Sequence, residues 1–277
     1  MAYEIRFYSD FNAYFKLIRN FVYSAEDTNN FLLSILETES NVPQKTEKKR
    51  VYAIGWSKDL PVWTAANFGD ETCLMTAGPE ECVAMGCEFF IEKSPFSSMF
   101  GPKKETEIFA RHLDLKLHHV QNMYRLDRVT KPQSGEGRSR LAEPEEAEQL
   151  AKWLELFKQE TGLPEKPDLP GSREWARRLS QRRRLYVWEI DGQIVAMTAA
   201  SGITEKGTRI SAVYCDTRFR GRGIASRLVA DVSQIVLNQG KKFCVLFADE
   251  TNASANAVYQ KIGYKEISKY SLYAKKS

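Results

Sequence analysis

The sequence predicts a mixed α/β protein built from two domains that share one order of elements. Its 277 residues correspond to about two domains at the usual size of roughly 150 residues each. Hydrophobic residues make up 43% and charged residues 27% of the chain, which is typical of a globular protein and excludes a disordered or collagen-like polymer. Apolar residues recur at strand spacing and at helix spacing in turn, so strands and helices mix along both halves.

The second half gives the clearer pattern, and its elements follow one another without long gaps. After a short strand near residues 139–142, apolar residues at helical spacing predict a helix through Phe157. The Asp191-Gly192 turn joins two apolar runs and predicts a β-hairpin over residues 185–200. The other expected elements are a helix over 173–184, a strand over 209–215, a helix from Ile224 to about Asn238, a buried strand over 242–248, a helix over 254–262 ended by Gly263, and a last strand over 270–275.

The first half repeats this order with little sequence identity, which indicates an internal duplication. Helices are expected around residues 11–18 and 31–36, over 80–93, and from Gly101-Pro102 to Leu113; strands are expected over 50–56, 61–68, 72–77, 97–104 and 122–129. A polar segment with two glycines, KPQSGEGRSR at residues 131–140, separates the halves. We therefore predict domains over residues 1–131 and 137–277.

Composition excludes several classes of function. Lys and Arg number 40 against 36 Asp and Glu, and an excess of four does not favour a nucleic-acid-binding protein. No apolar run approaches the roughly 18 residues that cross a bilayer, and the start, MAYEIRFYSD, lacks the pattern of a secretory signal. Five cysteines without a C-x-x-C pair indicate reduced thiols in the cytoplasm. The three histidines have no partners at zinc spacing, so no metal is expected.

One loop has the composition of a phosphate-binding site. The strand over 209–215 leads into R-G-R-G-I-A, residues 220–225, which opens an amphipathic helix. The first amides of a helix have no partners in the helix, and the dipole is positive there. Glycines let the backbone approach a ligand closely. The Gly-Lys-Ser/Thr of a P-loop is absent, and a G-x-G-x-x-G fingerprint fails at Ser226.

Two motifs resemble one enzyme superfamily. Arg220, Gly223 and Ala225 form R-x-x-G-x-A, which resembles the pyrophosphate loop of the GNAT superfamily of acyl-CoA-dependent N-acyltransferases. About thirty residues later, Asn252 to Tyr264 resembles the signature N-x-x-A-x-x-x-Y-x-K-x-G-[FY]. The resemblance covers roughly residues 137–277 and is strongest to a bacterial subgroup of predicted two-domain acetyltransferases.

The resemblance implies tandem GNAT-like domains, of which the C-terminal one has the complete acyl-CoA N-acyltransferase fold. It implies that the pantetheine arm lies between the splayed strands at 209–215 and 243–248, and that Tyr259 is the general acid, with core packing as the alternative. The expected binding residues are Val213, Tyr214, Cys215, Arg220, Gly221, Arg222, Gly223, Ile224, Ala225, Ser226, Asn252 and Asn256. Gly78-Pro79-Glu80-Glu81 stands where the first domain would need such a loop. We therefore expect residues 1–131 to form a degenerate GNAT-like domain, or another α/β domain, without a coenzyme A site.

The implied activity is transfer of an acetyl group from acetyl-CoA to a primary amine by direct attack in a ternary complex. The acceptor is expected to be a small-molecule amine or an amino-acid-like compound, and antibiotics and protein lysines stay open as acceptors. No general base stands out: Asp216, Asp249 and Glu250 lie near the strand ends and are interpreted as loop or capping carboxylates. Two other classes stay open, a non-catalytic acyl-CoA sensor and a nucleic-acid-binding module that uses the arginine-rich helix over 173–184.

Overall fold

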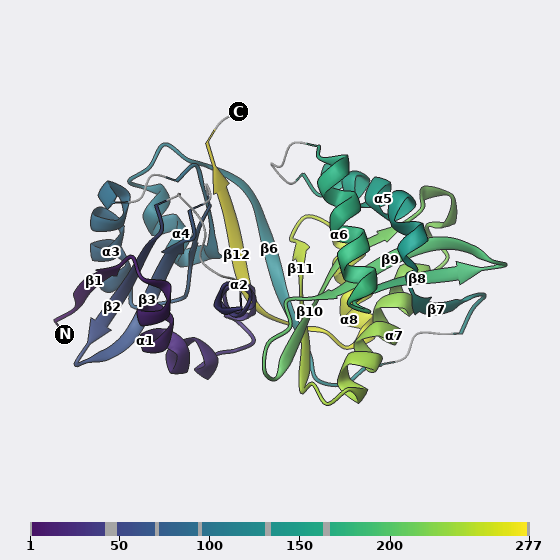
Figure 1. Cartoon of the computed structure of the whole chain (residues 1–277), viewed down its shortest axis with the longest axis horizontal. Coiled ribbons are helices and arrows are strands. Elements are labelled where there is room, and N and C mark those ends of the chain that lie inside the picture. The colour runs from purple at the N-terminus through teal and green to yellow at the C-terminus, as the bar shows by residue number, and fades with distance from the viewer. Residues whose placement is uncertain are drawn as a thin grey trace. The chain divides into compact units, whose positions relative to one another are not determined.

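The computed structural model describes residues 2–41, 49–69, 72–93, 96–130, 134–162 and 167–275. Contacts divide the chain into two compact units, Met1–Met123 with Ile267–Ser277, and Tyr124–Glu266. Strands and helices mix in both units, as the labels and colours of Figure 1 show. This arrangement confirms the predicted mixed α/β fold.

The first unit is built on an antiparallel hairpin that continues into a mixed sheet. Its elements are β1 (Glu4–Tyr8), α1 (Phe11–Ser24), α2 (Asn30–Ser40), β2 (Val51–Ser57), β3 (Leu60–Asn67), β4 (Thr72–Met75), α3 (Glu80–Lys93), β5 (Ser98–Pro102) and α4 (Lys103–Ala110). The strand β6 (Lys116–Leu126) continues from this unit into the second. The β2–β3 and β3–β4 pairs are antiparallel, whereas β4 and β5 run parallel.

The second half of the chain repeats the same order of elements. They are β7 (Arg138–Leu141), α5 (Ala147–Glu160), α6 (Leu169–Gln181), β8 (Leu185–Ile190), β9 (Gln193–Ser201), β10 (Gly207–Cys215), α7 (Ile224–Asn238), β11 (Phe243–Asp249), α8 (Ala253–Ile262) and β12 (Lys265–Ala274). In both halves of the chain a strand, two helices, three strands, a helix, a strand, a helix and a strand follow one another. The predicted duplication is therefore present in the order of elements.

The sheet of the second unit is buried on both faces. Successive strand residues point to opposite faces, and β8 divides accordingly. Tyr186 and Trp188 belong to the core that contains α7 and α8 residues, whereas Leu185 and Val187 belong to the core formed with α5 and α6. This double burial explains why β8 reads as a continuous apolar run rather than an alternating one.

Several details differ from the sequence-based expectations, among them the closing strand of the first half, which runs over Lys116–Leu126 rather than over 122–129. The strand β1 was not expected, and β7 occupies part of the predicted linker, whose residues 131–133 lie outside the described ranges. The helix α6 begins at Leu169 rather than at residue 173, because Asp168 caps it by accepting a hydrogen bond from the Gly171 amide at 3.0 Å.

The end of the chain contributes to the first unit. Strand β12 pairs antiparallel with β5, from Tyr270 opposite Pro102 to Ala274 opposite Ser98. Residues 267–277 therefore group with the first unit, whereas the predicted second domain runs to residue 277. A short apolar strand shows no preference for one sheet over another, so the sequence pattern could not indicate this pairing. The domain limits themselves stay a prediction.

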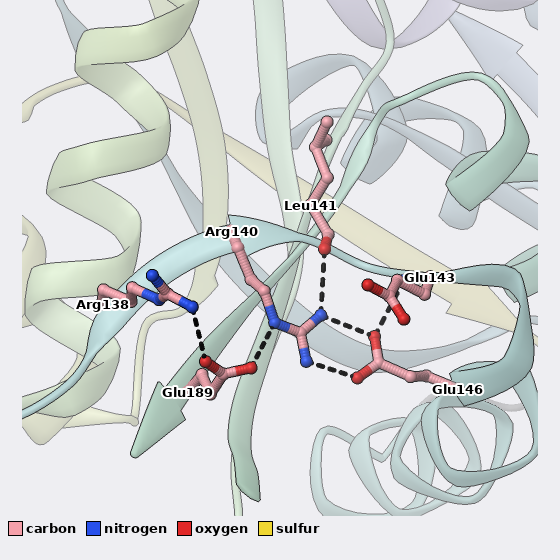
Figure 2. Close-up of polar contacts among 6 residues, drawn as sticks. All are labelled: Arg138, Arg140, Leu141, Glu143, Glu146 and Glu189. Atoms are coloured by element: carbon pink, nitrogen blue, oxygen red, sulfur yellow. Dashed lines mark hydrogen bonds and ion pairs between the residues drawn. The ribbon is translucent and has the colours of Figure 1, made fainter. Parts of the chain in front are cut away.

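A network of ion pairs holds β7 at the edge of the second unit's sheet (Figure 2). Arg140 on β7 contacts Glu146 with two nitrogens, at 2.6 and 2.9 Å, and contacts Glu189 on β8 at 2.6 Å. Arg138 adds a second contact to Glu189 at 3.1 Å. Because Arg138 and Glu189 are opposite each other in the β7–β8 register, the network fixes the alignment of the edge strand.

Candidate active site

A bulge in β10 turns the end of this strand away from regular pairing. Ser211 pairs with Ala199 and Tyr214 pairs with Met197, so two residues of β10 stand opposite one residue of β9. Ala212 takes the left-handed conformation at φ 51°, which is unusual for a residue with a side chain. Bulges of this kind redirect backbone groups and side chains.

The strands β10 and β11 separate toward their carboxyl ends. Their parallel pairing runs from Gly207 opposite Phe243 to Arg209 opposite Val245. Beyond that point β10 continues to Cys215 and β11 to Asp249 without further pairs between these described residues. The backbone of Val213 to Cys215 therefore borders an opening between two parallel strands.

The turn after β10 presents backbone amides to that opening. Gly221 has φ 78° and Gly223 has φ 71°, values that glycine adopts without strain. Helix α7 begins at Ile224, and Gly223 at its N-cap supplies no side-chain hydrogen bond to the first turn. The first amides of α7 are thus left for a ligand, and they carry the positive end of the helix dipole.

These elements line one open cavity of about 470 Å³. It collects most of the residues that the sequence analysis singled out. From β10, the loop and the first turn of α7, the lining contains Val213, Tyr214, Cys215, Arg220, Gly221, Gly223, Ile224, Ala225 and Ser226, and from α8 and its cap it contains Asn252 and Tyr259. The cavity therefore joins the uncapped amides of α7 to a tyrosine on a different helix.

Tyr259 reaches the cavity from a largely buried position. Its side chain is 8% exposed, and its ring lies 6.3 Å from that of Tyr124 and 6.1 Å from that of Tyr264. Burial disfavours the phenolate and raises the pKa of Tyr259 to about 12. The phenol therefore keeps its proton at neutral pH and can donate it to an atom in the cavity.

Arg220 is held at the cavity by contacts with three residues. Its Nε donates to the carbonyl of Cys215 at 2.9 Å, and its Nη2 lies 2.9 and 2.8 Å from the two carboxylate oxygens of Glu160. Its guanidinium also lies 5.3 Å from the centre of the Tyr214 ring. Glu160 itself lines the cavity from the last residue of α5.

Two of the predicted binding residues lie outside the lining of the cavity. The Asn256 side chain is used within the protein, since its oxygen accepts from Tyr124 at 2.7 Å and its nitrogen donates to the carbonyls of Asp249 and Asn252, both at 2.8 Å. Arg222 is exposed and pairs with Glu136 at 2.8 Å. Asn256 thus links β11, α8 and Tyr124, and this role is structural.

The comparisons with known proteins agree with this geometry. Residues 147–264 match the family model described as the Acetyltransferase (GNAT) family. Residues 147–264 form a GNAT domain. No curated protein matches the chain.

Solved structures extend the likeness to the whole chain, at the level of the fold. A GCN5-related N-acetyltransferase from Sphaerobacter thermophilus is 15% identical with a TM-score of 0.62, and the match covers 99% of this chain and 95% of that one. A GNAT-family acetyltransferase from Colwellia psychrerythraea is 12% identical with a TM-score of 0.60, covering 99% and 100%. A tandem GNAT protein from the clavulanic acid biosynthesis pathway is 12% identical with a TM-score of 0.56, covering 98% of each chain. The tandem architecture of GNAT-like folds is therefore shared.

The acidic residues at the strand ends of the GNAT domain hold loops in place. Asp216 accepts from the Arg218 amide at 3.0 Å and pairs with the Arg218 side chain at 2.7 Å, and this arginine lowers the pKa of the Asp216 carboxyl. Asp249 accepts from the Thr251 amide at 2.7 Å and from its hydroxyl at 2.6 Å. Within the described ranges, no group of three or more His, Cys, Asp and Glu side chains is placed to hold a metal ion, and no helix is long and apolar enough to cross a membrane.

The corresponding turn of the first unit differs from that of the GNAT domain. Only the four residues 76–79 separate β4 from α3, whereas the eight residues 216–223 separate β10 from α7. The Gly78 amide donates to the buried Glu105 carboxylate at 3.2 Å, and Glu80 and Glu81 occupy the first turn of α3. A Cβ at Gly78 would lie 2.7 Å from the Cβ of Trp63. This turn is packed and negatively charged.

The sequence analysis missed Glu160 as a cavity residue. Glu160 lies 60 positions before Arg220, at the polar end of an amphipathic helix, where glutamate is an ordinary surface residue. Phe219, Ser254, Ala255 and Val258 also line the cavity without a local signal that distinguishes them. Only the folded chain brings these residues to the loop.

Proposed function

We propose that the chain is an acetyl-CoA-dependent N-acetyltransferase that transfers the acetyl group to a primary amine by direct attack in a ternary complex. The observation that carries the proposal is the single cavity that joins the uncapped amides of α7 to the phenol of Tyr259. The GNAT match over residues 147–264 supports the same activity.

The residues of the cavity fit coenzyme A. The amides of Gly221 to Ser226 would bind the diphosphate, and the exposed backbone of Val213 and Cys215 would bond to the pantetheine amides as an added strand does. Neither Gly221 nor the N-cap position supplies a side chain that would fill this space. Acetyl-CoA supplies the activated acetyl group; acetyl is chosen because it is the usual acyl group of the superfamily.

Tyr259 is proposed as the general acid of the reaction. The amine nitrogen forms a bond to the acetyl carbon, the carbon–sulfur bond breaks, and the Tyr259 phenol donates its proton to the departing sulfur. The acylated nitrogen then releases a proton, and one proton returns to the Tyr259 oxygen to restore the phenol. The attacking ammonium group must first lose a proton. Because Asp216 and Asp249 are occupied by their loops, we assign that proton to water.

The five cysteines are free thiols, which supports a reducing compartment such as the cytoplasm.

Acceptor-dependent release of free coenzyme A tests the activity. A panel of primary amines and amino acids is incubated with acetyl-CoA, and the thiol released is measured for the wild-type protein and for Tyr259→Phe. The substitution keeps the ring that packs against Tyr124 and Tyr264 but removes the proton. We expect kcat to fall by about 10²–10⁴-fold, the usual contribution of general acid–base catalysis, with the affinity for coenzyme A unchanged.

Tyr264→Phe is the matched control for this experiment. Its hydroxyl lies 2.8 Å from that of Ser233, and Tyr264 does not line the cavity. The control should keep kcat near the wild-type value. Equal turnover of Tyr259→Phe and the wild type would remove Tyr259 from the mechanism. Binding of acetyl-CoA without release by any amine would favour the acyl-CoA sensor over the enzyme.

A further inference from the structure

Glu160 stands out because its charge opposes the character of the cavity that it lines. It is the one acidic residue among the residues that line this cavity in the described part of the chain. It is also the last residue of α5, where the negative end of the helix dipole disfavours a carboxylate. A nearby cation is therefore needed to stabilise the carboxylate there. Arg220 is that cation, and its Nη2 lies 2.9 and 2.8 Å from the two carboxylate oxygens.

A diphosphate on the loop and the Glu160 carboxylate require the same guanidinium. Arg220 directly precedes Gly221, and its Nε is tied to the carbonyl of Cys215 at 2.9 Å. Arg220 and the residues at the start of α7 line the same cavity, so an anion bound to the amides there would compete with Glu160 for the guanidinium. A phosphate that approaches would also be repelled by the carboxylate at the same end of the cavity.

We propose that Glu160 is a positioning residue that pairs with Arg220 while the cavity is empty and is displaced from Arg220 when the diphosphate of coenzyme A binds. The exchange forms and breaks no covalent bond: one ion pair replaces another on the same guanidinium. Glu160 thereby weakens coenzyme A binding, because part of the binding free energy is used to separate the Glu160–Arg220 pair. The inference rests on the proposed function, since it requires that the loop binds a diphosphate.

Glu160→Gln isolates the charge, because the amide keeps the size of the side chain. We expect it to lower the dissociation constant for coenzyme A about two- to fivefold, the range that exposed ion pairs contribute. Acetyl-pantetheine carries the thioester arm but no diphosphate, so its affinity should not change. A merely structural role for Glu160 would alter the affinities for both ligands in parallel.

Glu148→Gln is the matched control. Glu148 lies on the same helix, its side chain is 48% exposed against 44% for Glu160, and it pairs with Arg173 at 2.5 Å outside the cavity. It removes the same charge from the protein and should leave coenzyme A affinity unchanged. Salt screens exposed charges, so the ratio of the wild-type to the Glu160→Gln dissociation constant should decrease toward one as the salt concentration is raised.

Titration calorimetry with the full chain measures the dissociation constants of both ligands and decides between the possible outcomes. Tighter binding of coenzyme A by Glu160→Gln, with unchanged acetyl-pantetheine affinity, supports the exchange. The effect should also become smaller in an Arg220→Gln background, where no pair remains to be separated and only the direct repulsion between Glu160 and the diphosphate is left. Unchanged or weaker coenzyme A binding by Glu160→Gln overturns it, since Glu160 would then be neutral or would hold Arg220 in its productive position. Failure of the wild-type protein to bind coenzyme A at all would instead overturn the proposed function.

Discussion

At the scale of single residues, the state of the Tyr259 phenol sets the expected pH dependence. Burial raises the pKa of Tyr259 to about 12, and a general acid acts only while it is protonated. Activity that depends on this proton is therefore retained until the pH rises toward 12. We expect the kcat of the wild-type protein to show no alkaline decline between pH 8 and 10. A decline centred near pH 9 that is absent from Tyr259→Phe would contradict this expectation.

Gly223 is the residue at which a side chain should do most harm to cofactor binding. It stands at the N-cap of α7 with φ 71°, so Gly223→Asp would place a carboxylate beside the amides that bind the diphosphate. We expect coenzyme A affinity to fall at least about tenfold, from repulsion and from the lost space. Calorimetry measures the change. Wild-type affinity in this variant would refute the assignment of the loop.

The strain of a side chain at positive φ needs its own control. Gly240 follows the opposite end of α7 with φ 95°, and no atom lies within 4 Å of the position of its Cβ. Gly240→Asp therefore introduces the same charge and a similar backbone strain far along the helix from the loop. We expect this variant to bind coenzyme A as the wild type does, which separates the local effect at Gly223 from a general loss of stability.

At the scale of elements, the Arg140 network makes the edge strand β7 sensitive to one substitution (Figure 2). Arg140 is 22% exposed and bridges Glu146 and Glu189, which are 17% and 16% exposed. Arg140→Met keeps the apolar stem but leaves both carboxylates without this cation, so we expect the free energy of unfolding to fall by about 1–2 kcal/mol. Urea denaturation measures it. Arg138→Met, at a side chain 76% exposed, should have a much smaller effect, and equal effects would contradict the proposed role of the bridge.

The same network predicts how the difference in the free energy of unfolding between the wild type and Arg140→Met varies with pH. Hydrogen bonds from Arg140 and then Arg138 hold the pKa of Glu189 below its ordinary value. A carboxyl whose pKa is lowered by folding stabilises the folded state above its unfolded pKa of about 4.3, and this contribution is lost as the pH falls through the folded value. The difference between the wild type and Arg140→Met should therefore be full at pH 6–7 and shrink below about pH 4. A difference that grows in acid would contradict this assignment.

The sequence predicted elements well wherever apolar spacing was regular. The helix from Ile224 and the strand over 209–215 lie as expected, because one is amphipathic over four turns and the other leads directly into a glycine loop. The bulge at Ala212 was not foreseen, since alanine carries no turn signal. Strand β1 was missed because its residues are only partly buried and their pattern is weak. The pairing of β12 with β5 depends on contacts more than 160 residues apart in sequence.

At the scale of the whole molecule, the site was predictable where it is continuous in sequence. The loop from Arg220 to Ser226 and the helix that carries Tyr259 each contain a motif, and the fold brings both to one cavity. Glu160 comes from a third element with no motif of its own, so no local pattern could reveal its contact with Arg220. Asn256 shows the opposite case: its position in a motif suggested a ligand contact, whereas its amide is bonded within the protein.

The duplication leads to a prediction about stoichiometry, because the two copies of the turn have diverged in charge and length. The turn before α3 has four residues, its Gly78 amide is bonded to Glu105, and two glutamates follow at the start of the helix. A diphosphate at this turn would be repelled by these carboxylates, and the Gly78 amide could not bind it because that amide is already bonded to Glu105. We therefore expect one coenzyme A per chain. Calorimetry should give a stoichiometry near one for the wild type and for Glu105→Gln, in which Glu80 and Glu81 remain.

Gly223→Asp makes this expectation decisive, because it disables the loop of the second unit while leaving the first unit intact. If all binding occurs at α7, the strong binding isotherm should disappear in this variant. A stoichiometry of two in the wild type, with half of the sites retained in Gly223→Asp, would mean that the turn before α3 also binds the cofactor. The charge and packing at Gly78 favour the first outcome, since a helix end that carries its own carboxylates attracts a second anion poorly.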